Sequence, residues 1–262
     1  MRPATEFLLS SALTFEVTPN SVHFLPHAFN YAHGTWFKFI VIHDTITPTQ
    51  CSATSSGSNA GGIHRMFVCN GSSLTRHSVI YIDALAHILT EIETNARCKL
   101  DAKYEPFLKT YRELVACKES KRGPADCNAN RRLQRLKDSL NSEIGRHFEC
   151  MKVVSAGSGT VFIHNERQRD KYVVCLNTKS GHYRPTLRDI EFAKGVLMQA
   201  VGGLEQYKVI AQRKPSKKSL QRIFGEQIAK TKLGLCIEKL KPKTTTTTNT
   251  KTKTKTRKHK IV

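Results

Sequence analysis

Residues 180–186, with the sequence SGHYRPT, carry the strongest local signature of chemistry in the chain. A glycine permits a tight turn, the imidazole of His182 titrates near neutral pH, and the guanidinium of Arg184 can grip a carboxylate or phosphate through two donors. A helix is expected to begin directly after the loop, and the N–H groups at a helix start favour an anion. We therefore predict an anion-binding loop with His182, Tyr183 and Arg184 as ligand contacts. The alternative is a structural loop in which His182 and Tyr183 pack into the core and Arg184 pairs with an acid.

A β-hairpin and a helix are expected to hold this loop in place. Residues 160–164 and 171–176 are rich in β-branched and aromatic side chains, as strands are, and a charged turn separates them. Thr186 and Asp189 have the spacing of a helix capping box, and an apolar stripe follows them. The glycine pair at 202–203 is the expected end of that helix.

The region 159–194 resembles a module of uncharacterised proteins of large nucleocytoplasmic DNA viruses. Similar modules occur in some bacterial proteins and in plant IQ-motif calmodulin-binding proteins. The resemblance is carried by the VFI and VVCLN strands and by the SGHYRPT entry to the helix, and the chain has no IQ motif. A Lys/Thr-rich tail is also similar to those of giant-virus proteins. The resemblance implies a viral protein of the host nucleus or cytoplasm or of the virion, with other virion proteins as further partners.

Residues 32–35, with the sequence AHGT, are similar to the His-Gly-Ser/Thr triplet of ADP-ribosyltransferases. In that family the His contacts the ribose of a nicotinamide cofactor, so His33 becomes a further candidate ligand contact. The Tyr and Glu that complete the family's site have no counterpart that we can place on this sequence. The similarity implies an alternative to a non-enzymatic role, namely an enzyme or ligand-binding protein that acts on a phosphate-bearing substrate through His182, Arg184 and His33.

Charge is distributed unevenly along the 262 residues. The chain has 42 Lys and Arg against 21 Asp and Glu, a formal net charge of +21. Residues 1–95 carry −2, residues 96–212 carry +9 and residues 213–262 carry +14. We expect a near-neutral β-rich region (1–95), a basic helical region with the hairpin-loop-helix module (96–212), and a basic linker with a Lys/Thr tail (213–262). So basic an end is expected to associate with a polyanion.

Residues 241–260 form a low-complexity run dominated by Lys and Thr. Such a segment buries too little apolar surface to offset the entropy of ordering, so we expect disorder. Its alternating cations predict non-enzymatic, sequence-independent binding to nucleic acid or another polyanion, and six phosphate contacts would give a log–log salt slope of about −5 on duplex DNA. A solubilising or nuclear-import tail is the alternative. The residues expected to contact the polyanion are Lys251, Lys253, Lys255, Arg257, Lys258 and Lys260.

Eight cysteines are scattered along the chain without a Cys-x-x-Cys pair. A chain of this length can build a core without disulfides, so we expect reduced, mostly buried thiols in an intracellular protein. Neither a metal site nor a cofactor is expected, because no Cys/His set has ligand spacing. No run approaches the ~20 apolar residues of a membrane-spanning helix, so no membrane association is expected.

The remaining patterns complete an expected α+β fold. Residues 35–42, 66–69 and 78–82 are expected strands, and Asp83 is expected to cap a helix that starts after it. Residues 104–115 have the apolar spacing of an amphipathic helix.

A second amphipathic stripe runs over residues 133–148, and the glycine-containing stretch 157–160 reads as a turn before a strand. Four cations lie near the beginning of the stripe, which predicts either a solvated basic face or a helix that reads a nucleic-acid groove. They are Arg131, Arg132, Arg135 and Lys137. After Tyr207 the pattern is lost, apart from residues 220–235, which are expected to form one more short basic helix.

Overall fold

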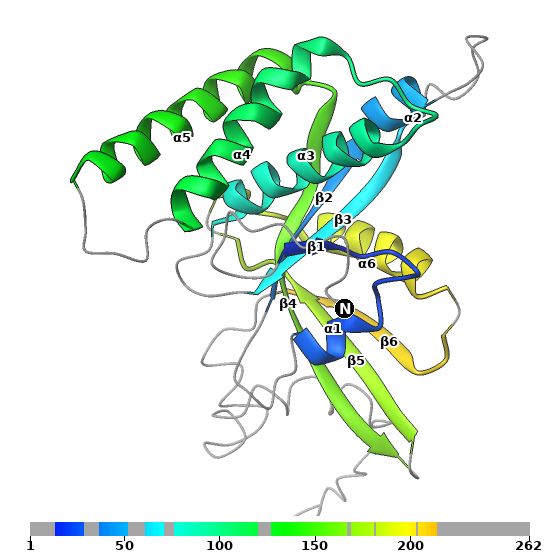
Figure 1. Cartoon of the computed structure of the whole chain (residues 1–262). Helices are drawn as coiled ribbons and strands as arrows, with labels where there is room; N and C mark the ends of the chain where they lie inside the picture. The colour runs from blue at the N-terminus through cyan, green and yellow to red at the C-terminus, as the bar shows by residue number, and fades with distance from the viewer. Residues whose placement is uncertain are drawn as a thin grey trace, which may run out of the picture.

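The computed structural model describes residues 14–28, 37–51, 61–70, 76–119, 127–166, 169–180, 182–202 and 204–213. Within these ranges helices and a single mixed sheet are combined, so the expected α+β class is confirmed (Figure 1). The strands are β1 (Thr14–Glu16), β2 (Phe37–Asp44), β3 (Ile63–Asn70), β4 (Met151–Glu166), β5 (Arg169–Asn177) and β6 (Tyr207–Gln212). The helices are α1 (Phe24–Ala28), α2 (Ile46–Cys51), α3 (His77–Thr94), η2 (Ala102–Tyr104, a 3₁₀ turn), α4 (Glu105–Glu119), α5 (Cys127–His147) and α6 (Leu187–Val201).

The strands are arranged in the order β1-β3-β2-β4-β5-β6. Neighbours are antiparallel except β5 and β6, which run parallel and are connected through α6. The central pairing of β2 with β4 brings together strands from both sides of residue 95.

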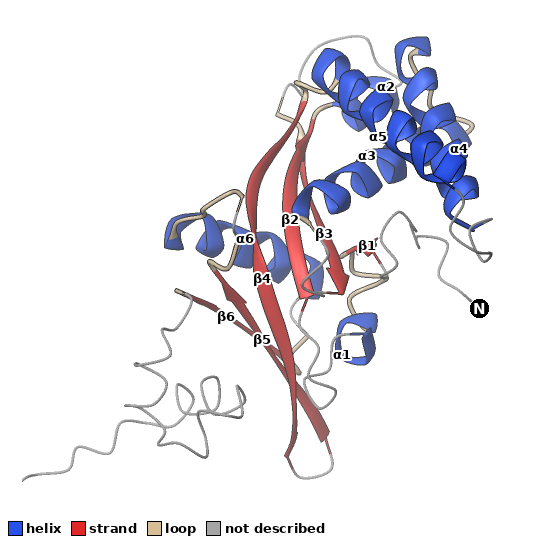
Figure 2. Cartoon of the chain, turned by 90° about the vertical axis from the view of Figure 1, so that its left-hand side faces the viewer, coloured by secondary structure: helices blue, strands red, loops and turns tan. Residues whose placement is uncertain are grey.

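Both faces of the sheet are covered by helices, because β2 is apolar on both sides. Ile40 and Ile42 of β2 belong to a core shared with α3, α4 and α5, whereas Phe39 and Val41 belong to a core shared with α6. Successive side chains of a strand point to opposite faces, so a continuous apolar run suits a strand that is buried twice. Figure 2 shows the two layers, with α3, α4 and α5 on one side of the sheet and α6 on the other.

The expected helices over residues 104–115, 133–148 and 186–202 are present. The apolar stripes of the first two are buried in the core, where Phe107 and Leu140 are among the least exposed side chains. Thr186 caps α6 in a capping box with Asp189, and Gly202 ends the helix in the left-handed conformation, as predicted. None of the helices in the described ranges is long and apolar enough to span a membrane.

The beginning of α3 differs from the prediction. Residues 78–82 were expected to form a strand, but they form the first turns of α3, which starts at His77. The β-branched and aromatic composition of this stretch favoured a strand, yet tertiary packing overrides that preference. Asp83 is therefore not a cap. It lies buried inside the helix and accepts hydrogen bonds from the hydroxyls of Thr14 (3.0 Å) and Tyr111 (3.0 Å).

Residues 157–160 do not form a turn, because β4 runs through them. Gly157 and Gly159 are paired with Phe39 and Phe37 of β2. A Cβ atom at either glycine would overlap the ring of its partner, so the two rings fill the space that side chains at 157 and 159 would need. The glycines are thus close-approach positions inside a strand.

The last described strand, β6, was missed by the sequence pattern. Tyr207 and Val209 are buried while Lys208 between them is exposed, so the strand does alternate, but over too few residues to stand out. The hydroxyl of Tyr207 donates to the carbonyl of Val22 at 3.1 Å and ties this edge strand to the start of the chain.

The expectation of reduced thiols is wrong for Cys175, which is disulfide-bonded, and for Cys51 and Cys98, which form a disulfide with each other at a Cα–Cα distance of 4.2 Å. The two residues are 47 positions apart, and only the packing of α2 beside the end of α3 brings them together. Spacing along the sequence could not reveal such a pair. Cys69 and Cys117 are buried, as expected.

Candidate functional site

The SGHYRPT loop lies against the first residue of α3. His77 is buried, and its Nε2 lies 2.9 Å from the carbonyl oxygen of Gly157 while its Nδ1 lies 3.5 Å from Oγ of Ser180. A carbonyl only accepts, so Nε2 carries the proton and donates, which leaves Nδ1 as the acceptor facing the Ser180 hydroxyl. The loop and the helix start are therefore joined through one imidazole.

Tyr183 holds the loop against the same imidazole. Its ring lies edge-on to the rings of His77 and His182, with centroid distances of 5.8 Å and 4.9 Å. The backbone N–H of Tyr183 donates to Oγ of Ser180 at 3.2 Å. The ring is half-buried, and this burial raises the pKa of the Tyr183 hydroxyl. His182, in contrast, is exposed.

Basic side chains dominate the electrostatic environment of His77. Burial lowers the pKa of His77; the hydrogen bond to Gly157 opposes the change, and the charges of Lys38 and His182 lower the pKa further. Burial also lowers the pKa of Lys38, against the opposing influence of Cys69. Both side chains whose charge acts on His77 are basic, and each of them makes it harder for His77 to take up a proton.

The backbone of Arg184 has an unusual conformation. It has a φ of 44°, and among the described residues it is the one non-glycine residue with positive φ. It also precedes Pro185, and a residue before proline normally adopts extended backbone. Residues held in such sparsely populated conformations cluster at ligand sites, where the surrounding structure enforces them. The guanidinium is exposed, and in the described part of the chain it makes no ion pair with a carboxylate.

We define the loop site by the residues that these observations bring together at the start of α3: Lys38, His77, Ser180, His182, Tyr183 and Arg184. Of the residues predicted as ligand contacts, His182 and Tyr183 lie beside His77, and Arg184 follows them on the same loop. His33 and the six cations of the tail lie outside the described residues. Lys38 and His77 were not predicted, because they come from β2 and α3 and only the fold places them here.

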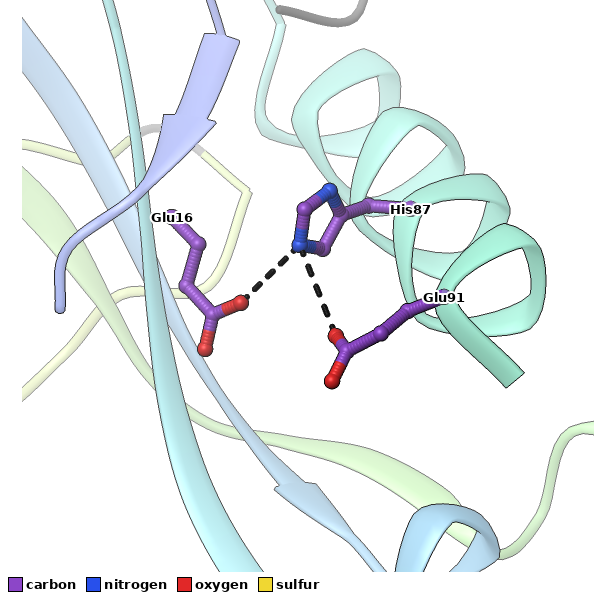
Figure 3. A group of neighbouring side chains, drawn as sticks. All are labelled: Glu16, His87 and Glu91. Carbon is purple, nitrogen blue, oxygen red and sulfur yellow. Dashed lines mark hydrogen bonds and ion pairs between the residues drawn. The ribbon is translucent and has the colours of Figure 1, made fainter. Parts of the chain in front are cut away.

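A second charged cluster lies between β1, β2, β3 and α3, and all of its members except Glu91 are buried. Arg65 donates from Nε to Oε1 of Glu16 at 2.9 Å and from Nη1 to Oδ2 of Asp44 at 3.3 Å, and its Nη2 also donates to Glu91. Nε2 of His87 lies 3.0 Å from Oε2 of Glu16 and 3.8 Å from Oε2 of Glu91 (Figure 3). We call these five residues the Arg65 network.

The Arg65 network satisfies its own charges. Burial by itself would raise the pKa of Glu16, but hydrogen bonds from His87 and Arg65 outweigh it and lower that pKa. Burial opposes the charge of Arg65 as well, and the carboxylates of Glu16 and Glu91 more than compensate and raise its pKa. Asp44 also accepts from the N–H groups of Ile46 (2.8 Å) and Thr47 (3.1 Å), and so caps α2.

Glu16, His87 and Glu91 have the residue types of a metal site, since one ligand atom from each lies within 4.8 Å of the others. The guanidinium of Arg65, however, already binds the carboxylates of both glutamates. A divalent cation would have to displace this arginine from a buried position. The arrangement therefore favours an ion-pair network over metal binding.

The chain matches no protein-family model, no curated protein and no solved structure at a significant level.

Proposed function

We propose that this protein binds a phosphate-bearing ligand at the loop site. The observation that carries the proposal is the placement of Ser180, Tyr183 and His182 of the loop against His77 at the start of α3. The charges of Lys38 and His182 there disfavour protonation of the imidazole. An anion placed among them would relieve this repulsion. A phosphate also suits the exposed guanidinium of Arg184, because phosphate oxygens accept two parallel hydrogen bonds from it.

The start of α3 supports the same ligand class. The first N–H groups of a helix are free of intrahelical partners and carry the positive end of the helix dipole. His77 is the first residue of this 18-residue helix, and the cap residue Arg76 makes no side-chain cap hydrogen bond. The helix start thus adds donors next to the cationic side chains.

The chemistry available at the loop site is acceptance of a proton by His77. Its Nε2 proton is held by the Gly157 carbonyl and its Nδ1 faces the Ser180 hydroxyl. Bound phosphate would raise the pKa of His77, because a nearby negative charge favours the protonated imidazole. Ligand binding and proton uptake are therefore coupled.

Calorimetric titration with inorganic pyrophosphate tests this proposal. We expect saturable binding, weakened about tenfold by Lys38→Met or His182→Gln, because each variant removes a charge-assisted contact. Lys208→Gln is the matched control, since Lys208 is exposed on β6 and removes the same charge elsewhere. Equal losses in all three variants, or no saturable binding by the unchanged protein, would refute the proposal.

We also propose that the basic C-terminal region binds nucleic acid or another polyanion. This proposal is supported by charge alone: residues 213–262 carry a net charge of +14. It keeps the non-enzymatic role expected from the cations of the tail, in a protein that resembles those of large DNA viruses. Its test is anisotropy of a labelled DNA duplex with the full chain, compared with a variant in which Lys251, Lys253, Lys255, Arg257, Lys258 and Lys260 are all Gln. Unchanged affinity and an unchanged salt slope in that variant would refute it.

A further inference from the structure

Helix α5 presents two faces of opposite character. Leu133 and Leu140 are buried in the core that α5 shares with α4. With 3.6 residues per turn, Arg131 and Arg135 lie about 140–180° around the helix from these leucines, and Arg132 lies about 80–100° from them. All three are exposed. We call them the arginine face.

The arginine face lies where a large partner can reach it. In Figure 1, α4 lies between α3 and α5, so α5 forms the outer edge of the helical layer. The side of α5 that faces away from α4 is therefore turned away from the rest of the described structure.

The charge of this face is not matched within the described residues. Arg131, Arg132 and Arg135 make no ion pair there, whereas Arg112 on α4 pairs with Glu93 and the buried Arg65 has carboxylate partners. The nearest acid along the helix on that side, Asp138, accepts a hydrogen bond from Gln134 at 2.9 Å.

The position of the three arginines along α5 also leaves their positive charge unmatched. The three arginines fall within the first nine residues of α5, and the described part of its first turn contains no acidic residue. The first turn, which carries the positive end of the helix dipole, therefore supplies no counter-charge to them. Lysines would be sufficient for a face that only contacts solvent. Arginine differs in having a planar guanidinium, which can donate two parallel hydrogen bonds to phosphate oxygens.

We propose that the arginine face binds the phosphate backbone of double-stranded nucleic acid. A duplex is favoured over a single strand because α5 contains no Phe, Tyr or Trp on which unpaired bases could stack. The inference extends the second proposed function by giving the folded part of the chain its own nucleic-acid contact. It does not depend on the loop site.

The test is anisotropy of a labelled DNA duplex across a salt series with the full chain. The decisive variant combines Arg131→Gln, Arg132→Gln and Arg135→Gln. The matched control combines Arg97→Gln, Lys99→Gln and Lys208→Gln, which removes the same charge from exposed positions outside α5. Each set is made in the natural chain and in the variant whose six tail cations are Gln, so that the tail and the arginine face are measured separately.

We expect the α5 variant to bind at least about tenfold more weakly at low salt and to lose about 3 from the magnitude of the log–log salt slope, because each phosphate contact contributes about 0.9. The control set should change the slope by less than about 1. Equal effects of the two sets, or no effect of the α5 set in the tail-neutralised chain, would overturn the inference. The same variants are also titrated with a labelled acidic peptide. If the α5 variant lost binding to this peptide but bound the duplex as before, the inference would be overturned too. If the tail substitutions alone left the duplex affinity and the salt slope unchanged, only the proposal for the tail would fail.

Discussion

The Arg65 network and the loop site both gather charged side chains around a histidine, and they differ in how the charge is matched. In the network, Arg65 reaches three carboxylates, and Glu16 also accepts a hydrogen bond from His87. In the loop site, the charges that act on His77 come from Lys38 and His182, and both repel its protonated form. One cluster carries its own counter-ions, while in the other both charges that act on the imidazole of His77 lower its pKa.

This difference separates a structural role from a binding role on physical grounds. Buried charges are tolerated where partners satisfy them, and removing one partner leaves the others uncompensated. Like charges that repel one another lower stability, and proteins commonly accept that loss where it serves binding. Removing charge should therefore weaken the Arg65 network and relax the loop site.

The largest expected effect is the loss of Arg65. Arg65→Gln would leave Glu16 and Asp44 buried without their cation, and we expect the free energy of unfolding to fall by about 3–5 kcal/mol. Urea denaturation measures the change. Because this variant can fail to fold, the pair Arg65→Met with Glu16→Gln provides a second measurement, and it should be more stable than Arg65→Gln alone. A loss below about 1 kcal/mol for Arg65→Gln would show that the network is not structural.

The dependence of stability on pH in the acidic range tests the role of Glu16. The folded-state pKa of Glu16 lies below its ordinary value of 4.5, so the unfolded chain takes up the proton first as the pH falls. The stabilisation is present above about pH 4.5 and is lost as the pH falls through the lower folded-state value. We expect Glu16→Gln to reduce stability at neutral pH by about 1–3 kcal/mol and to flatten this part of the profile. Parallel profiles for the two proteins would contradict the assignment.

Substitution of Lys38 should change stability in the opposite direction. Lys38→Met removes a partly buried cation whose charged form is penalised by burial, and we expect stability to stay the same or rise by up to about 1 kcal/mol. Pyrophosphate binding should weaken in the same variant. Exposed Lys208→Met on β6 is the control, and a marked destabilisation by Lys38→Met would remove the contrast between the two clusters.

The smallest expected effect is a proton-linked change at His77. Its folded-state pKa lies below the ordinary 6.5, so stability should decline as the pH falls below that value, and His77→Gln should remove this decline. Pyrophosphate should shift the imidazole pKa upward, which NMR titration of the ring protons can follow. An unchanged imidazole titration in the presence of saturating pyrophosphate would place the ligand elsewhere.

Local patterns in the sequence were sufficient for elements whose signals lie within a few residues of one another. The capping box of α6 and the stripe of α4 are such cases, because caps and amphipathic periodicity are local. The start of α3 and the edge strand β6 were missed, since tertiary packing decides them. For the loop site, His182, Tyr183 and Arg184 followed from one motif.

Other parts of the two clusters come from segments far apart in the chain. Nothing near Lys38 or His77 in the sequence indicates the loop, which is more than 100 residues away. The same holds for the Arg65 network, in which Arg65 is 49 positions from Glu16 and 26 from Glu91. Sequence patterns identify residue types in such cases, and only the fold brings them together.

The glycines of β4 make some positions of this chain interdependent across more than a hundred residues. At Gly159 the space for a side chain is taken by the ring of Phe37, so alanine at 159 should be accepted only when residue 37 is trimmed, for instance to leucine. At Gly157 the backbone carbonyl of Asn177 intrudes as well as Phe39, and trimming the ring would not make room. In related chains, positions 37 and 159 should therefore change together, while position 157 should stay glycine whatever residue stands at 39.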